Sequence, residues 1–225
     1  MEFEIPEGRS VIVTDDGTEL TIHLIERLQS RGWPVVVLRF PAESTWPGSA
    51  IPASVPLVAM PELNEDSLQK ALLKITQTVG KPAVFIHLHP TCRDCQDGDI
   101  HFTESAKQVL QTVFLAAKHL KEDLNQAATL GKGIFMTAVR LDGEFGLGAN
   151  SDFDPISGGL FGLVKSLNLE WESVFCRAVD LDPAIDPETG ADLLIEELLD
   201  PNRRIVEVAY GPKGRMTLGL ELEKF

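Results

Sequence analysis

Short apolar runs alternate along this chain with segments whose apolar residues recur at helical spacing, and this alternation limits the possible folds. Ser10–Thr14 and Val35–Leu38 are apolar runs of the kind found in parallel strands buried on both faces. Between them, Glu19–Arg31 has apolar residues three and four positions apart, which is typical of an amphipathic helix. The first 40 residues therefore predict a strand, a helix and a second strand, connected by a right-handed crossover.

The same alternation continues along the chain. It predicts further strands at 57–60, 83–88, 133–139 and 174–181, and further helices at 66–79, 103–127, 155–170 and 188–199. Residues 204–210 and 215–223 flank a Gly-Pro-Lys-Gly turn and predict a terminal hairpin or a strand with an extension. We therefore expect one α/β domain over residues 1–225, with a doubly wound, mostly parallel sheet.

Charge and composition exclude several classes of partner. The chain has 20 Lys and Arg against 34 Asp and Glu, a formal charge of −14, which argues against binding to nucleic acid or anionic membranes. No apolar stretch approaches the roughly 20 residues of a membrane helix, and the N-terminal residues lack the pattern of a secretory signal. Three cysteines make no disulfide framework, so we expect a cytoplasmic protein.

The first strand-to-helix turn is where such a fold binds a dinucleotide, and the turn needs several glycines to admit the pyrophosphate. Here Thr14–Leu20 contains one glycine, Gly17, and three carboxylates, Asp15, Asp16 and Glu19. Each carboxylate about 4 Å from a phosphate charge would cost about 1 to 4 kcal/mol. We therefore expect these residues to cap the helix rather than to bind a cofactor, with an unusual nucleotide loop as the alternative.

Arg39, at the end of the second predicted strand, favours the opposite interpretation. A basic residue at this place can receive the 2′-phosphate of NADP. Without the glycines, the turn offers no binding site for the rest of the cofactor. We therefore interpret Arg39 as a solvated rim residue.

A helix near residue 160 carries Phe161 and Lys165, four positions apart and hence on one face. In short-chain dehydrogenase/reductases this face carries Tyr-x-x-x-Lys, in which the lysine lowers the pKa of the phenol and the phenol protonates the substrate carbonyl. Phenylalanine has no proton to give, and the single tyrosine of the chain, Tyr210, lies in a distant predicted strand. We therefore expect no catalytic residue at these degenerate positions.

A longer stretch carries a more specific resemblance. The segments Gly159–Leu167, Leu169–Trp171 and Cys176–Leu181 resemble the ketoreductase region of type I polyketide synthases and polyunsaturated fatty-acid synthases. They resemble its structural half, a truncated, non-catalytic reductase-like fold that precedes and packs against the catalytic half. The resemblance extends to Val11–Gly17 and Val206–Tyr210, so it covers most of the chain and is loosest between residues 40 and 130.

The resemblance implies a function. The chain would be a catalytically silent subdomain supporting the catalytic half of a synthase that reduces β-ketoacyl thioesters on acyl carrier protein. It would bind no cofactor itself, with NADPH in the catalytic half, and its partners would be that half and other synthase domains, including the carrier protein. The alternative is a divergent active reductase that uses Lys165 with Thr137, Ser157 or Tyr210.

Residues 87–101 contain a group of histidines and cysteines, namely His87, His89, Cys92, Cys95 and His101. His87 and His89 share one face at the carboxyl end of a predicted central strand, and the Cys-x-x-Cys pair has the spacing of a zinc knuckle. Because this pair occurs once, a zinc site, a redox pair and plain loop thiols all remain possible. The family resemblance implies no metal here.

Three further expectations concern residues outside these motifs. Cys176 lies inside an apolar run and is predicted to be a small core residue. The acidic pair Glu196-Glu197 and the Asp-rich stretch 180–192 are predicted to be solvated.

Overall fold

The structure, a computed structural model, describes residues 4–41, 48–90, 104–148 and 155–219. The strands are β1 (Arg9–Thr14), β2 (Val35–Arg39), β3 (Leu57–Ala59), β4 (Lys81–Leu88), β5 (Ile134–Val139), β6 (Phe175–Leu181), β7 (Glu207–Gly211) and β8 (Gly214–Met216). The helices are α1 (Glu19–Gln29), α2 (Glu65–Val79), α3 (Glu104–Leu130), α4 (Gly159–Glu170) and α5 (Pro187–Leu199), with a 3₁₀ turn, η2 (Pro155–Gly158), before α4.

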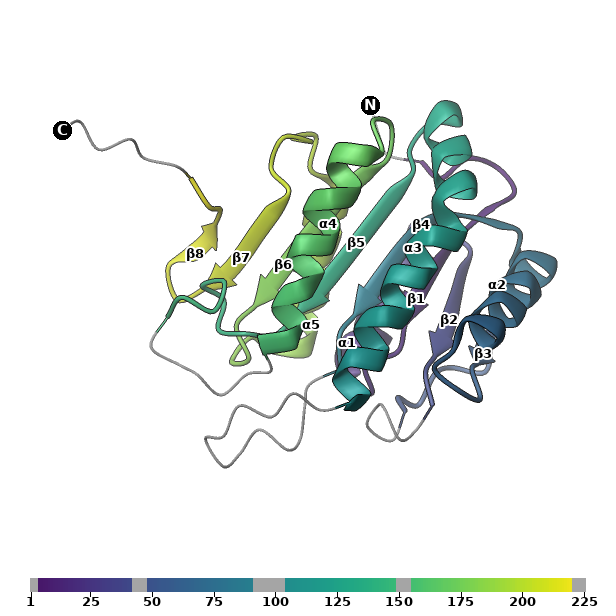
Figure 1. Cartoon of the computed structure of the whole chain (residues 1–225), viewed down its shortest axis with the longest axis horizontal. Helices are drawn as coiled ribbons and strands as arrows, with labels where there is room; N and C mark the ends of the chain where they lie inside the picture. The colour runs from purple at the N-terminus through teal and green to yellow at the C-terminus, as the bar shows by residue number, and fades with distance from the viewer. Residues whose placement is uncertain (1–3, 42–47, 91–103, 149–154, 220–225) are drawn as a thin grey trace.

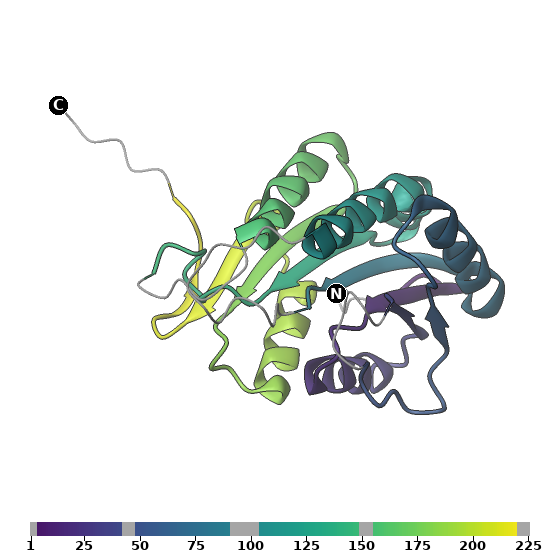
Figure 2. The same cartoon turned by 60° about the horizontal axis from the view of Figure 1, so that its bottom comes forward.

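The eight strands within the described residues form one sheet in the order β3-β2-β1-β4-β5-β6-β7-β8. Strands β1 to β7 pair in parallel, and β8 pairs antiparallel with β7. The order reverses between β1 and β4, which is the switch point of a doubly wound sheet. Helices α2, α3 and α4 cover one face, and α1 and α5 cover the other (Figures 1 and 2). The predicted fold class is confirmed.

The central strands are buried on both faces, which explains their continuous apolar runs. In β4 and β5, Phe85 and Phe135 point toward α2–α4 and stack with ring centroids 5.0 Å apart. Their neighbours Val84 and Ile134 point toward α1 and α5. Because side chains alternate along a strand, the sheet separates two apolar cores, one under each helical layer.

Three of the described helices begin where the sequence supplies a capping side chain. The residues Thr18, Asn64 and Asp186 precede α1, α2 and α5, and each side chain accepts a hydrogen bond from a backbone N–H in the first turn. Pro187 then occupies the first turn of α5, where its missing N–H costs nothing. Each crossover therefore places its helix start beside the carboxyl edge of the sheet.

Several boundaries differ from prediction. The terminal hairpin is shorter than expected, because β7 begins at Glu207 and β8 ends at Met216. Helix α3 extends to Leu130, and the predicted helix near residue 160 opens with the 3₁₀ turn. Within the described residues, none of the helices is both long and apolar enough to cross a bilayer.

The burial predictions are confirmed in part. Asp186, Glu188, Asp192 and Glu196 are exposed, as predicted. Cys176 is fully buried, as predicted. Asp180 and Glu197, however, were expected in solvated stretches and are only 0% and 1% exposed. Both carboxylates are buried because the fold supplies them with donors, described below, and a paired carboxylate can enter a protein interior.

Candidate functional site

Asp15 lies at the carboxyl end of β1, where a dinucleotide phosphate would approach, and its side chain is only 1% exposed. Its Oδ1 accepts hydrogen bonds from the Gly17 backbone N–H at 2.9 Å and from Ser49 Oγ at 2.7 Å. Its Oδ2 accepts from Arg39 Nε at 2.6 Å and from the Ser49 backbone N–H at 3.2 Å. Both oxygens, with two lone pairs each, are therefore filled by donors from the chain itself.

Arg39 is not the solvated rim residue that the sequence suggested. Its side chain is 25% exposed and turns back from β2 to pair with Asp15, while its Nη2 donates to the Ser49 carbonyl at 2.6 Å. A Cβ at position 48 would lie 2.5 Å from the guanidinium, so Gly48 is needed for this arrangement. A 2′-phosphate could use Arg39 only by displacing a buried carboxylate.

Asp16 closes the same turn from the other side. Its Oδ1 accepts from the Thr18 backbone N–H at 3.0 Å and from Thr21 Oγ1 at 2.7 Å, and its Oδ2 accepts from Thr18 Oγ1 at 2.8 Å. Gly17, between the carboxylates and the helix, has φ +77°, a conformation that suits glycine. The turn is thus held closed by its own side chains, and its carboxylates face the place that a pyrophosphate would need. These residues do not fit a dinucleotide.

The space next to this turn is small. Asp16, His89 and Arg140 line part of a shallow hollow at the carboxyl edge, with apolar residues of β4, β5 and β6 as its floor, and the hollow has no enclosed room for a water-sized molecule. Small-molecule sites typically measure about 300–1,000 Å³. The hollow is therefore small for a nicotinamide dinucleotide.

His87 is fully buried at the end of β4 and connects this strand with β1. Its Nδ1 lies 2.9 Å from Thr14 Oγ1, and its Nε2 lies 3.2 Å from His89 Nδ1. Thr14 Oγ1 also accepts from the Leu88 N–H and donates to the Leu88 carbonyl. Because its one proton is used there, the network is satisfied when His87 Nδ1 and His89 Nδ1 are the donors.

Burial keeps both rings neutral. Desolvation, with a smaller contribution from His89, lowers the pKa of His87 well below its usual value, and desolvation lowers the pKa of His89 to about 4. The other members of the predicted histidine and cysteine group, Cys92, Cys95 and His101, lie outside the described residues. Among the residues that are described, no three His, Cys, Asp or Glu side chains are arranged to hold a metal.

On α4, Phe161 and Lys165, the two positions compared with the Tyr-x-x-x-Lys motif in the sequence analysis, make unrelated contacts. Phe161 is 7% exposed, and its ring meets that of Phe145 edge-on with centroids 6.0 Å apart. Lys165, one turn later, is about half exposed and its Nζ lies 3.0 Å from Oε1 of Glu207 on β7. The lysine charge is thus paired with a carboxylate instead of lying beside a phenol.

Tyr210 cannot substitute for that phenol, because it lies on the other side of the sheet. Its side chain belongs to the core beneath α1 and α5, whereas Phe161 belongs to the core beneath α2–α4. The Tyr210 hydroxyl donates to Glu197 Oε1 at 2.5 Å. Thr137 and Ser157 are buried, and among the described residues the Thr137 hydroxyl has no hydrogen-bond partner.

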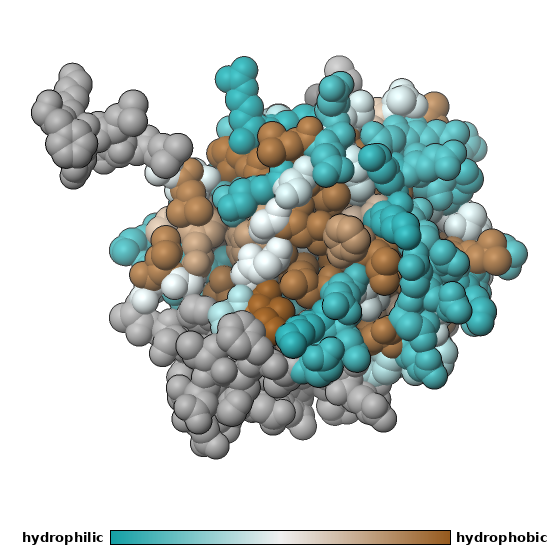
Figure 3. Space-filling view, in the orientation of Figure 1, coloured by the Kyte–Doolittle hydropathy of each residue, from teal (hydrophilic) through white to brown (hydrophobic). Residues whose placement is uncertain are grey.

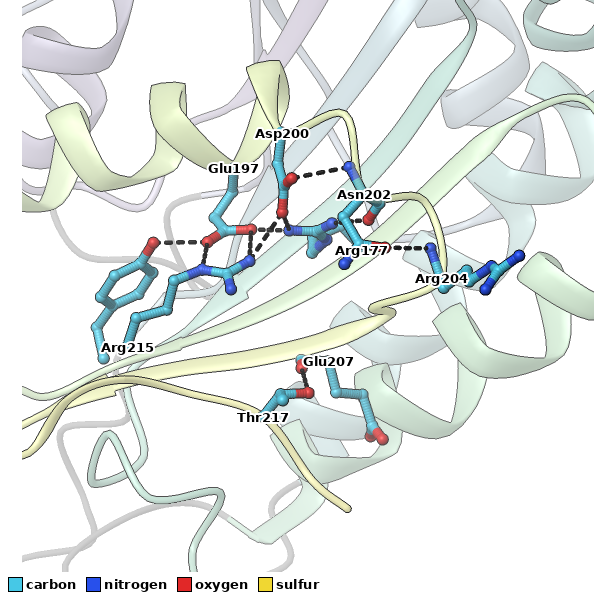
Figure 4. A network of polar contacts seen from close by, with 9 residues as sticks. Arg177, Glu197, Asp200, Asn202, Arg204, Glu207, Arg215 and Thr217 are labelled. Carbon is cyan, nitrogen blue, oxygen red and sulfur yellow. Dashed lines mark hydrogen bonds and ion pairs between the residues drawn. The ribbon is translucent and has the colours of Figure 1, made fainter. Parts of the chain in front are cut away.

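Glu197 belongs to a buried ion-pair network that the sequence analysis missed (Figure 4). It pairs with Arg177 of β6 and accepts from Arg215 Nε at 2.6 Å. Asp200 Oδ2 accepts from Arg177 at 3.0 Å and from Arg215 at 2.8 Å. The network ties β6, α5 and β8 together. An arginine inside the largely apolar strand β6 was the available signal, because a buried guanidinium requires carboxylate partners.

A second missed feature is the loop between β5 and α4, which winds around two carboxylates. Asp142 accepts hydrogen bonds from three backbone N–H groups of residues 144–148, each at 2.8 Å. Asp180 accepts from the N–H groups of Leu141 at 2.8 Å and Phe145 at 2.9 Å. Phe145 has φ +64°, an uncommon conformation for a non-glycine residue, which these bonds hold in place.

The two carboxylates differ in their pKa. Burial, with a smaller contribution from the charge of Asp142, raises the pKa of Asp180 to about 6. Burial also acts to raise the pKa of Asp142, but its three backbone donors outweigh burial, so that pKa lies below its usual value.

Comparison with known proteins identifies a relative by sequence. No protein-family model matches the chain. The chain is 31% identical over 215 residues to one of the subunits of a polyunsaturated fatty acid synthase from Thraustochytrium, a match that covers 93% of this chain and 7% of that synthase polypeptide. The chain therefore spans a small part of the relative's length.

Comparison with solved structures gives the fold. The 3-ketoacyl-(acyl-carrier-protein) reductase of Brucella melitensis, solved with NADH, matches with a TM-score of 0.68 at 14% identity, covering 89% of this chain and 94% of that one. A short-chain dehydrogenase/reductase family oxidoreductase from Aeromonas hydrophila matches with a TM-score of 0.61 at 17% identity, covering 86% and 93%. The chain thus has the Rossmann-type fold of short-chain dehydrogenase/reductases, and its sequence is similar to a segment of a polyunsaturated fatty acid synthase.

Proposed function

We propose that this chain is the structural, non-catalytic half of the ketoreductase region of a polyunsaturated fatty-acid or polyketide synthase. In this role it packs against and supports a catalytic half, which binds NADPH and reduces β-ketoacyl thioesters carried by acyl carrier protein. The chain itself binds no cofactor, and residues 1–225 act as one degenerate reductase-like domain. Other domains of the same cytoplasmic synthase are its further neighbours.

One observation carries this proposal. The turn that would cradle a pyrophosphate contains Asp15, whose four acceptor positions are taken by Arg39, Ser49 and Gly17. Binding a dinucleotide here would require breaking a buried ion pair, leaving a carboxylate with fewer donors and placing a phosphate beside it. The sequence similarity to a synthase, together with the reductase fold, supplies the context for a supporting role.

The chemistry on α4 agrees with this proposal. A reductase needs an acid at the position of Phe161, and Lys165, one turn later on the same helix, is paired with Glu207. Tyr210 lies across the sheet and donates to Glu197. The alternative, a divergent active reductase, would need both a different cofactor-binding site and a different general acid for the substrate carbonyl.

The supporting role can be tested by reconstitution. The catalytic half of the same synthase is produced alone and with this chain added as a separate polypeptide. We expect the added chain to bind, to raise the melting temperature of the catalytic half and to increase its NADPH-dependent turnover. Absence of binding, or NADPH-dependent reduction by this chain alone, would overturn the proposal.

A further inference from the structure

We propose that Asp142 and Asp180 share one proton, and that this proton holds residues 141–148 in place at acidic pH and lets them loosen as the pH rises. We call residues 141–148 the Asp142 loop. It follows β5 and lies beside the carboxyl ends of β6 and β7 (Figure 1). The inference goes beyond the proposed function, because it describes a conformational change within this chain that needs no partner domain and no nucleotide.

Two buried carboxylates hold the Asp142 loop by its backbone. Asp180 of β6 is 0% exposed, and Asp142 in the loop itself is 7% exposed. Asp180 accepts hydrogen bonds from the Leu141 N–H at 2.8 Å and the Phe145 N–H at 2.9 Å, one on each oxygen. Asp142 accepts from the N–H groups of residues 144, 146 and 148, each at 2.8 Å. The position of the loop therefore depends on these two side chains.

The two carboxyl groups also lie within hydrogen-bonding reach of each other. Ionised carboxylates only accept hydrogen bonds, so a bond between the two groups requires a proton on one of them. Burial raises the pKa of Asp180 to about 6, and the charge of Asp142 adds to this shift. Burial acts in the same direction on Asp142, but its three backbone donors outweigh burial and lower its pKa. The shared proton therefore belongs on Asp180, which donates it to Asp142.

The charged groups on the elements around the loop supply no cation to this pair. The cations there bind other acceptors, namely Arg140 the carbonyls of residues 183 and 185, Lys165 the carboxylate of Glu207, and Lys213 that of Glu144. Asp182, which follows β6, adds a further carboxylate beside the loop. The surface over α4 and beside β7 and β8 is also less hydrophilic than the surface over α2 (Figure 3). A second negative charge on the pair would therefore remain unpaired among the described residues.

The backbone of the Asp142 loop is held in an uncommon conformation. Phe145 has φ +64°, and its ring meets that of Phe161 on α4 edge-on, with centroids 6.0 Å apart. Gly143 has φ +67°, and a Cβ at this position would lie 2.3 Å from the Tyr210 carbonyl oxygen, so the loop packs directly against β7. A loop of this shape needs its side-chain acceptors, and it should open when their hold weakens.

The proton links the position of the loop to pH. When Asp180 is protonated, the pair carries one negative charge and the hydrogen bond between the two carboxyl groups is intact. When both groups are ionised, they repel each other in a buried place, and opening the loop to water relieves the repulsion. With a pKa of about 6 in the closed loop and about 3.9 in an open, solvated one, the ratio of closed to open loop should be about tenfold larger at pH 5 than at pH 8.

Amide hydrogen exchange of the whole chain at pH 5 and pH 8, followed by NMR, tests this inference. We expect the N–H groups of Gly146 and Gly148 to be about tenfold more protected at pH 5, relative to their intrinsic exchange rates. In Asp180→Asn the side-chain amide donates to Asp142 at every pH, so protection should agree within about twofold at the two pH values. Asp182→Asn is the matched control, because it removes a carboxylate beside the loop that hydrogen-bonds within its own turn, and it should keep the tenfold difference.

Three results would overturn the inference: equal protection at both pH values in the unsubstituted chain, a tenfold difference that persists in Asp180→Asn, or a difference that Asp182→Asn also abolishes. If Asp180→Asn does not fold, the carboxyl carbon-13 signals of the unsubstituted chain provide the test. Titration of Asp180 near pH 6 with a simultaneous change at Asp142 supports the shared proton, and titration of both groups near pH 4 overturns it. All these measurements use the chain alone, so their outcome is independent of whether it binds a catalytic half.

Discussion

The β1–α1 turn and the outer sides of helices α3 and α4 differ in which groups they leave without a partner in the chain. In the turn, carboxylates that lie at a potential binding edge are paired with Arg39, Ser49 and their own backbone. On the outer sides of α3 and α4, by contrast, Phe114 and Leu169 leave most of their apolar side chains exposed to solvent. The turn makes its hydrogen bonds within the chain, whereas the two exposed side chains keep apolar surface that a partner could cover.

This contrast indicates where binding energy is still available. A group whose hydrogen bonds are all made within the chain gains little from a ligand that must first displace them. An exposed apolar side chain gains about 25 cal/mol for each Å² that a partner covers. The contrast agrees with the proposed function, in which this chain binds another protein domain and binds no nucleotide itself.

Opening the turn should cost the most stability. Asp15→Ala leaves Arg39, Ser49 and the Gly17 N–H without their common acceptor, so we expect the free energy of unfolding to fall by about 3–5 kcal/mol. Glu19→Ala is the control, because Glu19 is exposed in the same turn, and we expect a change of about 0.5 kcal/mol or less. Urea titration followed by circular dichroism measures both. Equal stability of the two variants would show that the turn is not held by Asp15.

Lowering the pH should destabilise the fold through His89 at the carboxyl edge of the sheet and stabilise it by a comparable amount through Asp180 in the neighbouring loop. His89, with a pKa near 4 in the folded state against 6.5 unfolded, contributes stability above pH 6.5 that is lost as pH falls toward 4, by about 2–3 kcal/mol. Asp180 has the opposite sign: its raised pKa of about 6 gives stability that is present below about pH 4 and lost as pH rises through 6.

Two variants separate these opposing effects. His89→Gln should make the loss of stability between pH 6.5 and 4 shallower, and Asp180→Asn should make it steeper, as measured by thermal melting at several pH values. Changes in the opposite directions would refute the protonation states assigned to this edge.

Substitutions of the exposed residues Phe114 and Lys165 should change the free energy of unfolding least. Phe114→Asp in the isolated chain should change the free energy of unfolding by about 0.5 kcal/mol, and Lys165→Ala by less than about 1 kcal/mol, because both side chains are more than half exposed. Chemical denaturation measures both values. A loss of several kcal/mol from Phe114→Asp would mean that the Phe114 side chain belongs to the core and is not exposed to solvent.

The order of strands and helices could be predicted because β1, β2, β4, β5 and β6 are continuous apolar runs and the helices have clear periodicity. The absence of a glycine cradle and the presence of Phe161 could also be read directly from the sequence. These features depend on residues close together in the chain.

Contacts between distant residues could not be predicted. Arg39 was expected in solvent because its partner Asp15 is 24 positions away and is reached only when β2 lies beside β1. Glu197 was expected in solvent because its acidic neighbours suggested a hydrated face, whereas three partners from β6, β7 and β8 surround it.

Calorimetric titration of the isolated chain with NADPH tests the loss of nucleotide binding most directly. We expect no saturable heat up to about 1 mM, which corresponds to a binding free energy weaker than about −4 kcal/mol, and no change in melting temperature at that concentration. Saturable binding of one NADPH per chain, lost on charge reversal at Arg39, would refute this expectation, because the turn would then open to accept the nucleotide that its carboxylates should exclude.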